Sequence, residues 1–202
     1  MKVFLSVDID FWNHLSKRSL RPYLDELTRA SKARSIPISA VMNHQQMLPL
    51  LNASSADTLI NMDTHSDLAD SDVDTLNCGT WVSYFTHRFS SCYHWIHAGP
   101  ILEGECNMRE PIWGRRRPRP HLTDWADLIR EQVKAAPPLS ALLHDTVAVA
   151  VCSSPMYAHE DLIDQFTAWR KDWDIPYKKG RADEHYSRRA TPSRFRLTAA
   201  AR

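Results

Sequence analysis

Hydrophobic residues along this chain follow two different periods, which predict strands and helices in alternation. Four short runs of apolar, often β-branched residues lack helical spacing and predict strands covered on both faces, at residues 2–10, 36–43, 58–63 and 146–152. Between and after them, apolar residues recur at helical spacing and predict helices at residues 20–30, 46–51 and 158–173. A further helix is predicted to begin at a cap residue, Thr123, with one apolar face made of Trp125, Leu128, Ile129 and Val133.

Strands that alternate with helices are typical of an α/β fold with a parallel sheet. We therefore predict a three-layer sandwich in which a mainly parallel sheet lies between helices. The 202 residues fit a single α/β domain, which we place at residues 1–174, followed by a basic and partly disordered tail at residues 175–202. Residues 88–122 are rich in Trp, Pro, Gly and Arg and predict an irregular loop or lid.

Composition excludes several classes of protein. Apolar residues make up 43% and charged residues 24% of the chain, which excludes a mostly disordered protein and a collagen-like fibre. The apolar runs are far shorter than the roughly 20 residues of a membrane span, and a strand-like segment follows Met1, so we expect no membrane association, no signal peptide and a cytoplasmic location. The cysteines form no C-x-x-C pair and are expected to be free thiols: Cys78, Cys92, Cys106 and Cys152.

The net charge of +1 hides two regions of opposite charge. No Lys or Arg occurs between Arg34 and Arg88, and this stretch holds Asp57, Asp63, Asp67, Asp70, Asp72 and Asp74. A solvated acidic loop explains some of these aspartates, and a site that holds cations is the alternative. Residues 170–202 carry ten Lys or Arg against four Asp or Glu, and a second basic cluster consists of Arg115, Arg116, Arg117 and Arg119.

The predicted strands end in carboxylates and histidines. The first ends in the sequence DID, the second is followed by a histidine, and the third leads into the sequence DTHSD. The carboxyl ends of parallel strands meet at one edge of a sheet, where ligands bind. We therefore expect four carboxylates and two imidazoles to lie together at this edge: Asp8, Asp10, His44, Asp63, His65 and Asp67.

This set of side chains indicates a metal site. Carboxylates packed together raise one another's pKa and resist ionisation, and residues 35–87 offer no Lys or Arg to compensate them. Two divalent cations would balance four carboxylates and leave the imidazoles neutral as ligands. A ligand set rich in carboxylates suits Mn²⁺ or a similar ion, and ions about 3.5–4 Å apart are usual in hydrolases. Taken singly, a D-x-D segment can cap a helix and His44 can be a hydrogen-bonded core residue.

These motifs resemble those of the arginase/agmatinase (ureohydrolase) superfamily. Asp63-Thr64-His65-Ser66-Asp67 resembles its D-x-H-x-D motif, Ser6-Val7-Asp8-Ile9-Asp10 resembles its S-x-D-x-D motif, and His44 matches its upstream histidine ligand. In ordinary arginases the S-x-D-x-D segment lies late in the chain, whereas here it comes first. This order more closely resembles the small family of bacterial peptide arginases, which convert arginine side chains in peptides to ornithine. The resemblance covers roughly residues 1–85, with a weaker similarity at residues 153–157 (SSPMY).

The resemblance implies an arginase-like fold, two divalent cations, which would be Mn²⁺, and hydrolysis of a guanidino C–N bond to an amine and urea. The ligands of the first cation would be Asp8, His44, Asp63 and Asp67. The ligands of the second would be Asp8, Asp10, Asp63 and His65, so that Asp8 and Asp63 bridge. The residues that we expect to take part in catalysis are Asp10, His65 and Asn77.

The substrate side of the site has weaker sequence signals. The proton-carrying histidine of the superfamily lies shortly after D-x-H-x-D, where this chain has the sequence NCGT at residues 77–80. Three other histidines could take its place, although each also fits an ordinary surface or core position: His87, His94 and His97. A desolvated guanidinium needs a carboxylate partner, for which the candidates are Glu103, Glu105 and Glu110. The aromatic residue that we expect to form a pocket wall is Trp12.

Two other functions remain open at this point. The same metal scaffold could hydrolyse another amidine, an acylated amine or a phosphoester, because only the pocket would differ. Alternatively, the basic clusters, together with Tyr177, Tyr186 and Phe195, could bind a nucleic acid or another acidic partner beside a structural metal site. The partner that we favour is a peptide or a small guanidino compound.

Overall fold

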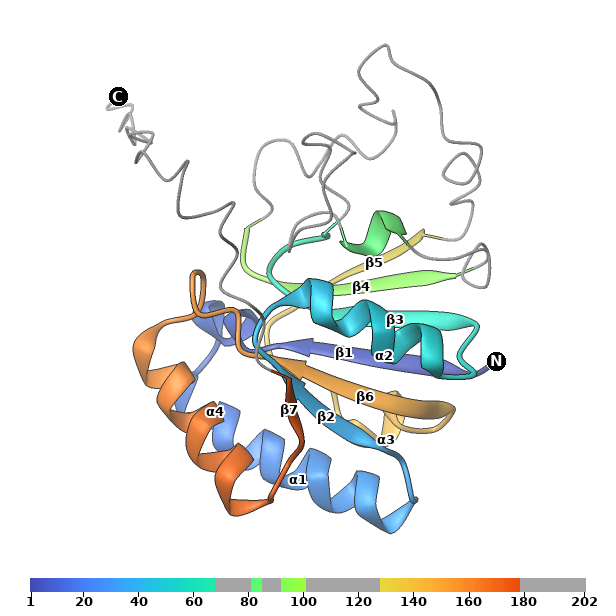
Figure 1. The fold of residues 1–202 in the computed structure, drawn as a ribbon. Coiled ribbons are helices and arrows are strands. Elements are labelled where there is room, and N and C mark those ends of the chain that lie inside the picture. Colours follow the sequence, from blue (N-terminus) through green and yellow to red (C-terminus); the bar gives the residue numbers. More distant parts are fainter. Residues whose placement is uncertain (68–80, 85–91, 101–127, 179–202) are drawn as a thin grey trace, which may run out of the picture.

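The computed structural model describes residues 1–67, 81–84, 92–100 and 128–178, which form a seven-stranded parallel sheet with helices on both faces (Figure 1). The strands are ordered β5-β4-β3-β1-β6-β2-β7. Their bounds are β1 Val3–Asp8, β2 Ile38–Val41, β3 Thr58–Met62, β4 Tyr93–Ala98, β5 Leu128–Val133, β6 Thr146–Cys152 and β7 Tyr177–Lys178. The predicted three-layer α/β sandwich with a parallel sheet is therefore confirmed.

The helices divide between the two faces of the sheet according to the direction of their connections. The α-helices are α1 Leu20–Ala33, α2 Met47–Ala53, α3 Leu139–Leu142 and α4 Glu160–Asp172, and the 3₁₀ helices are Ile9–His14, Lys17–Ser19, His44–Gln46 and Trp81–Tyr84. Connections that run toward β7 contain α1, α3 and α4, which pack on one face. Connections that run toward β5 contain α2 and the last 3₁₀ helix, which pack on the other face. Right-handed crossovers produce this division.

Alternation along the strands decides which side chains reach each face. In β1, Leu5 and Val7 pack into the core under α1, whereas Phe4 packs into the core under α2 and Ser6 donates a hydrogen bond to Met47 of α2 (3.0 Å). Asp8 is the next residue of β1 on the α2 face, after Phe4 and Ser6. Because β1 and β3 run in register, the residue that follows β3 lies beside Asp8 on the α2 face.

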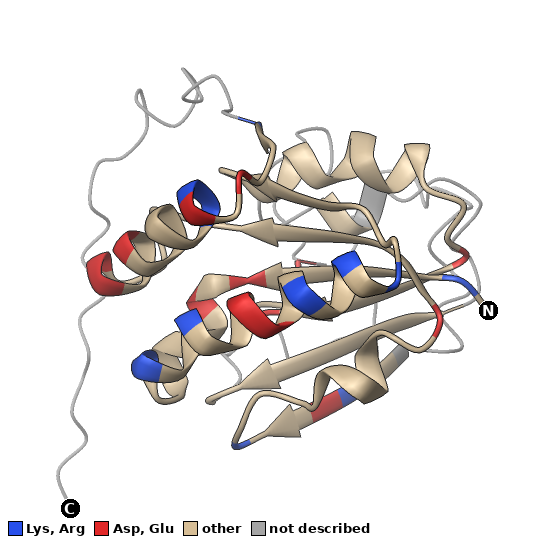
Figure 2. Cartoon of the chain, turned by 90° about the horizontal axis from the view of Figure 1, so that it is seen from below, with Lys and Arg blue, Asp and Glu red and all other residues tan. Residues whose placement is uncertain are grey.

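Helices α1 and α4 form one layer below the sheet. Trp169 of α4 is fully buried, and its indole donates to the Leu24 carbonyl (3.1 Å) and to Thr28 Oγ1 (2.9 Å) of α1. Seen from below, the outer surfaces of these helices carry charges of both signs (Figure 2). One ion pair crosses between the helices, from Arg21 to Asp172 (2.7 Å). Buried and exposed contacts therefore hold the two helices together.

Two predictions about the second half of the chain are wrong. Within the helix predicted from Thr123, the described residues Leu128–Val133 form strand β5, which pairs with β4. The predicted irregular stretch 88–122 contains β4, whose aromatic side chains Tyr93 and Trp95 are fully buried. The first residues of the predicted tail at 175–202 belong to the fold, because Ile175 is buried and Tyr177–Lys178 pair with β2, and the tail from residue 179 lies outside the described residues.

The other predicted elements are present. The four predicted strands and the helices predicted at residues 20–30, 46–51 and 158–173 all form, with bounds that shift by a few residues. The described cysteines, Cys92 and Cys152, are free thiols, as predicted, while Cys78 and Cys106 lie outside the described residues. Within the described part of the chain, we find no helix with the length and apolar character that crossing a membrane requires.

Candidate metal centre

The carboxyl ends of β1 and β3 meet at a point where the connections diverge. After β1 the chain leaves toward β7 across the α1 face, and after β3 it leaves toward β5 across the α2 face. Such a switch point is the usual ligand site of a parallel α/β sheet. Asp8 ends β1 and Asp63 follows β3 directly, so two carboxylates mark this point.

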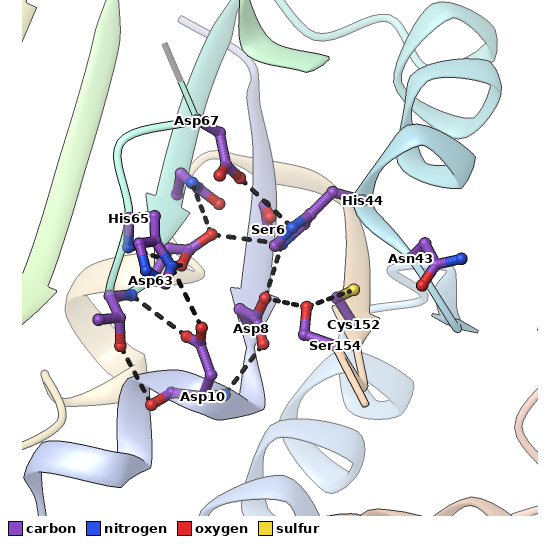
Figure 3. A network of polar contacts seen from close by, with 12 residues as sticks. Ser6, Asp8, Asp10, Asn43, His44, Asp63, His65, Asp67, Cys152 and Ser154 are labelled. Atoms are coloured by element: carbon purple, nitrogen blue, oxygen red, sulfur yellow. Dashed lines mark hydrogen bonds and ion pairs between the residues drawn. The ribbon is translucent and has the colours of Figure 1, made fainter. Parts of the chain in front are cut away.

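His44 approaches these carboxylates from the end of β2 (Figure 3). Its Nε2 atom lies 3.0 Å from Asp8 Oδ2 and 3.3 Å from Asp63 Oδ2, and its Nδ1 atom lies 3.4 Å from Asp67 Oδ2. The imidazole stacks on Trp81, with 5.5 Å between ring centroids and 5° between planes. His44 is 3% exposed. Its ring is therefore fixed among three carboxylates and shielded from water.

His65 forms a second group on the other side of Asp63. Its Nδ1 atom lies 3.3 Å from Asp10 Oδ2 and 3.8 Å from Asp63 Oδ1. One carboxylate, that of Asp63, is therefore shared by the two histidine groups. The side chain of His65 is 27% exposed, whereas the four aspartates are buried. The side of the cluster that faces solvent is the His65 side.

Backbone amides orient the carboxylates. The amide of Asp10 donates to Asp8 Oδ1 (2.9 Å), and the amide of His65 donates to Asp63 Oδ1 (2.9 Å). The amide of Thr64 donates to Asp10 Oδ1 (3.3 Å). An aspartate that accepts from the amide two residues later forms a local turn at the end of its strand. The D-x-D and D-x-H segments therefore build the turns that hold their own carboxylates.

Two further side chains, Ser154 and Trp81, each donate to one more carboxylate oxygen. Ser154 Oγ donates to Asp8 Oδ2, and Trp81 Nε1 donates to Asp67 Oδ2. Ser154 and Asp67 have φ angles of 36° and 55°, in the left-handed region that residues other than glycine rarely adopt. Such backbone strain persists only where the surrounding structure imposes it, and residues strained in this way are common at functional sites.

The buried carboxylates carry more negative charge than their surroundings balance. Burial raises the pKa of Asp63 well above its usual range, and the charges of Asp67, Asp10 and Asp8 raise it further. Burial also raises the pKa of Asp67 to about 6 and that of Asp8 above its ordinary value. Asp10 is the exception. Burial opposes its ionisation, but the hydrogen bond and charge of His65 lower its pKa.

The imidazoles are the cationic groups that act on these aspartates. Burial alone would lower the pKa of His44, yet the charges of Cys152 and of three aspartates raise it well above its usual range. Protonated imidazoles supply too little positive charge for four carboxylates. A divalent cation would supply the rest and displace these protons.

The donor atoms fit such cations. In three groups of described side chains, the potential ligand atoms lie within 4.8 Å of one another: Asp10, Asp63 and His65; His44, Asp63 and Asp67; and Asp8, His44 and Cys152. His44 Nε2 is buried and has no hydrogen-bond partner among the described residues, although it faces two carboxylate oxygens. Oxygen and imidazole donors of this kind suit first-row divalent ions. The buried aspartate and histidine groups could therefore hold a metal ion, as the sequence predicts.

The structure brings all six predicted ligands together but moves one predicted substrate contact away. Trp12 is fully buried, its ring packs against Phe11 and Tyr23, and its indole donates to Ser19 Oγ (3.1 Å). The chain turns into the 3₁₀ helix Ile9–His14 and sends this ring into the core under α1, so Trp12 does not form the predicted pocket wall. The other predicted catalytic or substrate residues lie outside the described residues: Asn77, Glu103, Glu105 and Glu110.

Tyr157 is an aromatic residue that sequence reasoning missed. It lies in the connection between β6 and α4, 42% exposed, with its ring centroid 5.4 Å from that of His65. The sequence signal that could have identified Tyr157 is the weak similarity at residues 153–157 (SSPMY), which also includes Ser154. Of the histidines considered as proton carriers, His94 lies 3.3 Å from Glu131, and His97 is buried and stacks on Trp95 (4.5 Å). The third, His87, lies outside the described residues.

Comparisons with known proteins add no identification. No family model matches this chain, and no curated protein or solved structure does either. The functional argument therefore rests on the site itself, in which two histidine groups share one buried carboxylate at the switch point of the sheet.

Proposed function

We propose that this chain is a metal-dependent hydrolase that cleaves a C–N bond of a guanidino group with two divalent cations, Mn²⁺ being the expected ion. The observation that carries the proposal is the position of Asp63, whose Oδ2 faces His44 and whose Oδ1 faces His65. Paired divalent cations lower the pKa of water and offset the negative charge that develops as water adds to carbon.

The residues around Asp63 would divide the ligand duties. Asp67, held by Trp81, would complete the His44 side, and Asp10 would complete the His65 side. Asp8 would be shared by the two sides. Its Oδ2 approaches His44, and its Oδ1 accepts from the amide of Asp10, a residue of the His65 side. Ligands fixed in this way would hold the cations in place, and a site ordered before the substrate binds favours a productive orientation of the reacting groups.

Charge favours a cationic substrate over an anionic one. Residues 35–87 contain no Lys or Arg, and the four site aspartates come from β1, β3 and the segments that follow them. With two cations balancing the four aspartates, this stretch still offers no Lys or Arg to bind the phosphate of a phosphoester, which favours a guanidino substrate over an anionic one. Hydrolysis of the guanidinium consumes one water and yields an ammonium group and neutral urea, so it releases no net proton.

Urea release tests the proposal directly. The full chain loaded with Mn²⁺ is incubated with arginine-containing peptides, free arginine and small guanidino compounds, and urea is measured together with the conversion of arginine to ornithine by mass spectrometry. We expect urea from at least one of these substrates and none after chelation. The Asp10→Asn variant, which loses a ligand on the His65 side only, is the matched control and should be strongly impaired.

Other outcomes of this experiment would contradict guanidino hydrolysis or identify another function. A fully metal-loaded protein that releases no urea from any guanidino substrate contradicts guanidino hydrolysis. Turnover of an amidine, an acylated amine or a phosphoester under the same conditions would identify the alternative on the same metal scaffold. The nucleic-acid alternative depends on residues 115–119 and on a tail that, from residue 179, lies outside the described residues.

Tyr157 is predicted to contact the substrate. Its ring lies at the solvent-facing side of the cluster, next to His65, where a guanidinium can stack on an aromatic face. A cation–π contact of roughly 0.7–2 kcal/mol predicts that Tyr157→Ala raises KM about 3- to 30-fold with a smaller change in kcat. Steady-state kinetics check this, with Tyr157→Phe and the exposed neighbour Met156→Ala as controls that stay near the wild type. An unchanged KM in Tyr157→Ala would exclude the contact.

A further inference from the structure

Cys152 lies on the His44 side of the candidate metal centre. It is the last residue of β6, the strand between β1 and β2, and it pairs in register with Asp8 on one side and Val41 on the other. Its side chain faces the α2 layer, the face of the sheet on which Asp8 lies. The thiol is therefore placed where the ends of β1 and β2 bring Asp8 and His44 together (Figure 3).

The thiol belongs to a compact donor group. Cys152 Sγ, a carboxylate oxygen of Asp8 and a ring nitrogen of His44 lie within 4.8 Å of one another, and all three residues are at most 3% exposed. Cys152 Sγ lies 3.3 Å from Ser154 Oγ, which in turn donates to Asp8 Oδ2. Sγ also lies 3.5 Å from the Met42 carbonyl. These weak contacts hold the sulfur beside Asp8 and His44 without using a strong donor or acceptor.

A second observation comes from His44. Its Nε2 atom is buried without a hydrogen-bond partner among the described residues, and it faces Asp8 rather than the solvent. Its Nδ1 atom faces Asp67 at 3.4 Å. A histidine that binds a metal commonly directs its other ring nitrogen at a carboxylate, which fixes the ring. The geometry of His44 fits this arrangement, with Nε2 as the ligand atom. Asp67 Oδ2, which also accepts from Trp81, would then orient the ring, which leaves Oδ1 as the atom with which Asp67 would bind the metal.

We propose that Cys152 is a metal ligand on the His44 side, and that this position prefers a borderline cation such as Zn²⁺ or Co²⁺. The inference rests on the proposed metal centre and specifies its chemistry. A thiolate, an imidazole and a carboxylate form a donor set that favours such ions over Mn²⁺, and the thiol proton leaves for solvent when the metal binds. The His65 side, with Asp10 and Asp63, has only oxygen and imidazole donors and suits Mn²⁺. The two positions therefore differ in metal preference.

Cobalt spectroscopy on the full chain tests this inference without any assay of activity. Chelator-treated protein is titrated with Co²⁺, bound Co²⁺ is measured by equilibrium dialysis, and the near-ultraviolet absorption of thiolate-to-Co²⁺ charge transfer is recorded. We expect the band in the wild type and its loss in Cys152→Ser and in Cys152→Ala. The matched control is Cys92→Ser, which removes the other described free thiol and should keep the band.

Competition between ions provides a second measurement for folded variants. Cys152→Ser is expected to lose about 10-fold or more in Zn²⁺ affinity and to change less in Mn²⁺ affinity. Bound Co²⁺ without a thiolate band, or a band that persists in both Cys152 variants, overturns the role of Cys152 alone. A wild-type protein that binds no divalent ion overturns the role of Cys152 and the proposed metal centre together.

Discussion

The Asp63→Asn variant is expected to bind almost no metal, whereas the wild type is expected to bind close to two divalent ions per chain. Asp63 belongs to both histidine groups, so a neutral amide at this position weakens both sides at once. The control Asp10→Asn removes a ligand from the His65 group only and should keep about one ion. Elemental analysis of protein purified with Mn²⁺ and without chelator gives both numbers.

The same pair of variants has opposite effects on the metal-free protein. Burial raises the pKa of Asp63 well above its usual range, so its ionised form destabilises the fold, and Asp63→Asn should raise the Tm of chelator-treated protein at about pH 8. His65 lowers the pKa of Asp10, so that carboxylate stabilises the fold, and Asp10→Asn should lower the Tm.

Activity gives the third readout of this pair. Loss of both cations removes several kcal/mol of transition-state stabilisation, so we expect kcat/KM of Asp63→Asn to fall at least about 10³-fold. Unchanged metal content in Asp63→Asn would contradict the shared-carboxylate assignment. A variant that loses metal and also unfolds would show itself by a lowered Tm, which is opposite to the expected change.

Removal of metal is expected to destabilise the protein, and more strongly as the pH rises. The folded-state pKa of Asp67 is raised from 3.8 to about 6 and that of Asp63 is raised further, so both bind protons more tightly in the folded than in the unfolded state. This contribution is fully present below about pH 4 and is lost as the pH rises through the folded-state values. The raised pKa of His44 acts in the same direction, with its loss above its ordinary value of 6.5.

Thermal unfolding with and without Mn²⁺ at several pH values checks this prediction. A cation at a hundredfold excess over its Kd stabilises the fold by about 3 kcal/mol, which for a chain of this length corresponds to a Tm increase of roughly 5–10 °C. We expect the full increase near pH 8 and a much smaller one near pH 5, because protons compete for the same carboxylates. An increase that is independent of pH would exclude binding at these aspartates.

The sequence predicted that the six candidate ligands lie together because they follow strand ends. Each strand that carries them is a short apolar run, and a parallel sheet brings such ends to one edge whatever its strand order. The local turns of D-x-D and D-x-H then orient the carboxylates without distant partners. The hydrogen bonds from Ser154 to Asp8 and from Trp81 to Asp67 were not predictable in this way, because they join residues that are 146 and 14 positions apart in the sequence.

The errors in the fold concern strands at the β5 edge of the sheet. The sequence LIREQV of β5 has apolar residues at both helical and strand spacing, and pairing with β4 decides between them. Ile129 remains 49% exposed, so burial left little pattern to detect. In β4, most positions are histidines or aromatic residues instead of aliphatic ones, so the sequence does not have the usual pattern of a strand. Tyr93 and Trp95 of this strand nevertheless pack in the core under α2.

The place of β6 in the sheet has a consequence for the order of assembly. The six ligands predicted from the sequence lie within the first 67 residues, but β6, from Thr146 to Cys152, separates β1 from β2 and so sets the spacing between Asp8 and His44. During synthesis the ligands leave the ribosome long before this strand does. A nascent chain that ends before β6 therefore has the six predicted ligands but lacks Cys152 and the strand that sets the spacing between Asp8 and His44. The proposed metal centre would accordingly form late, after the most non-local pairing of the sheet.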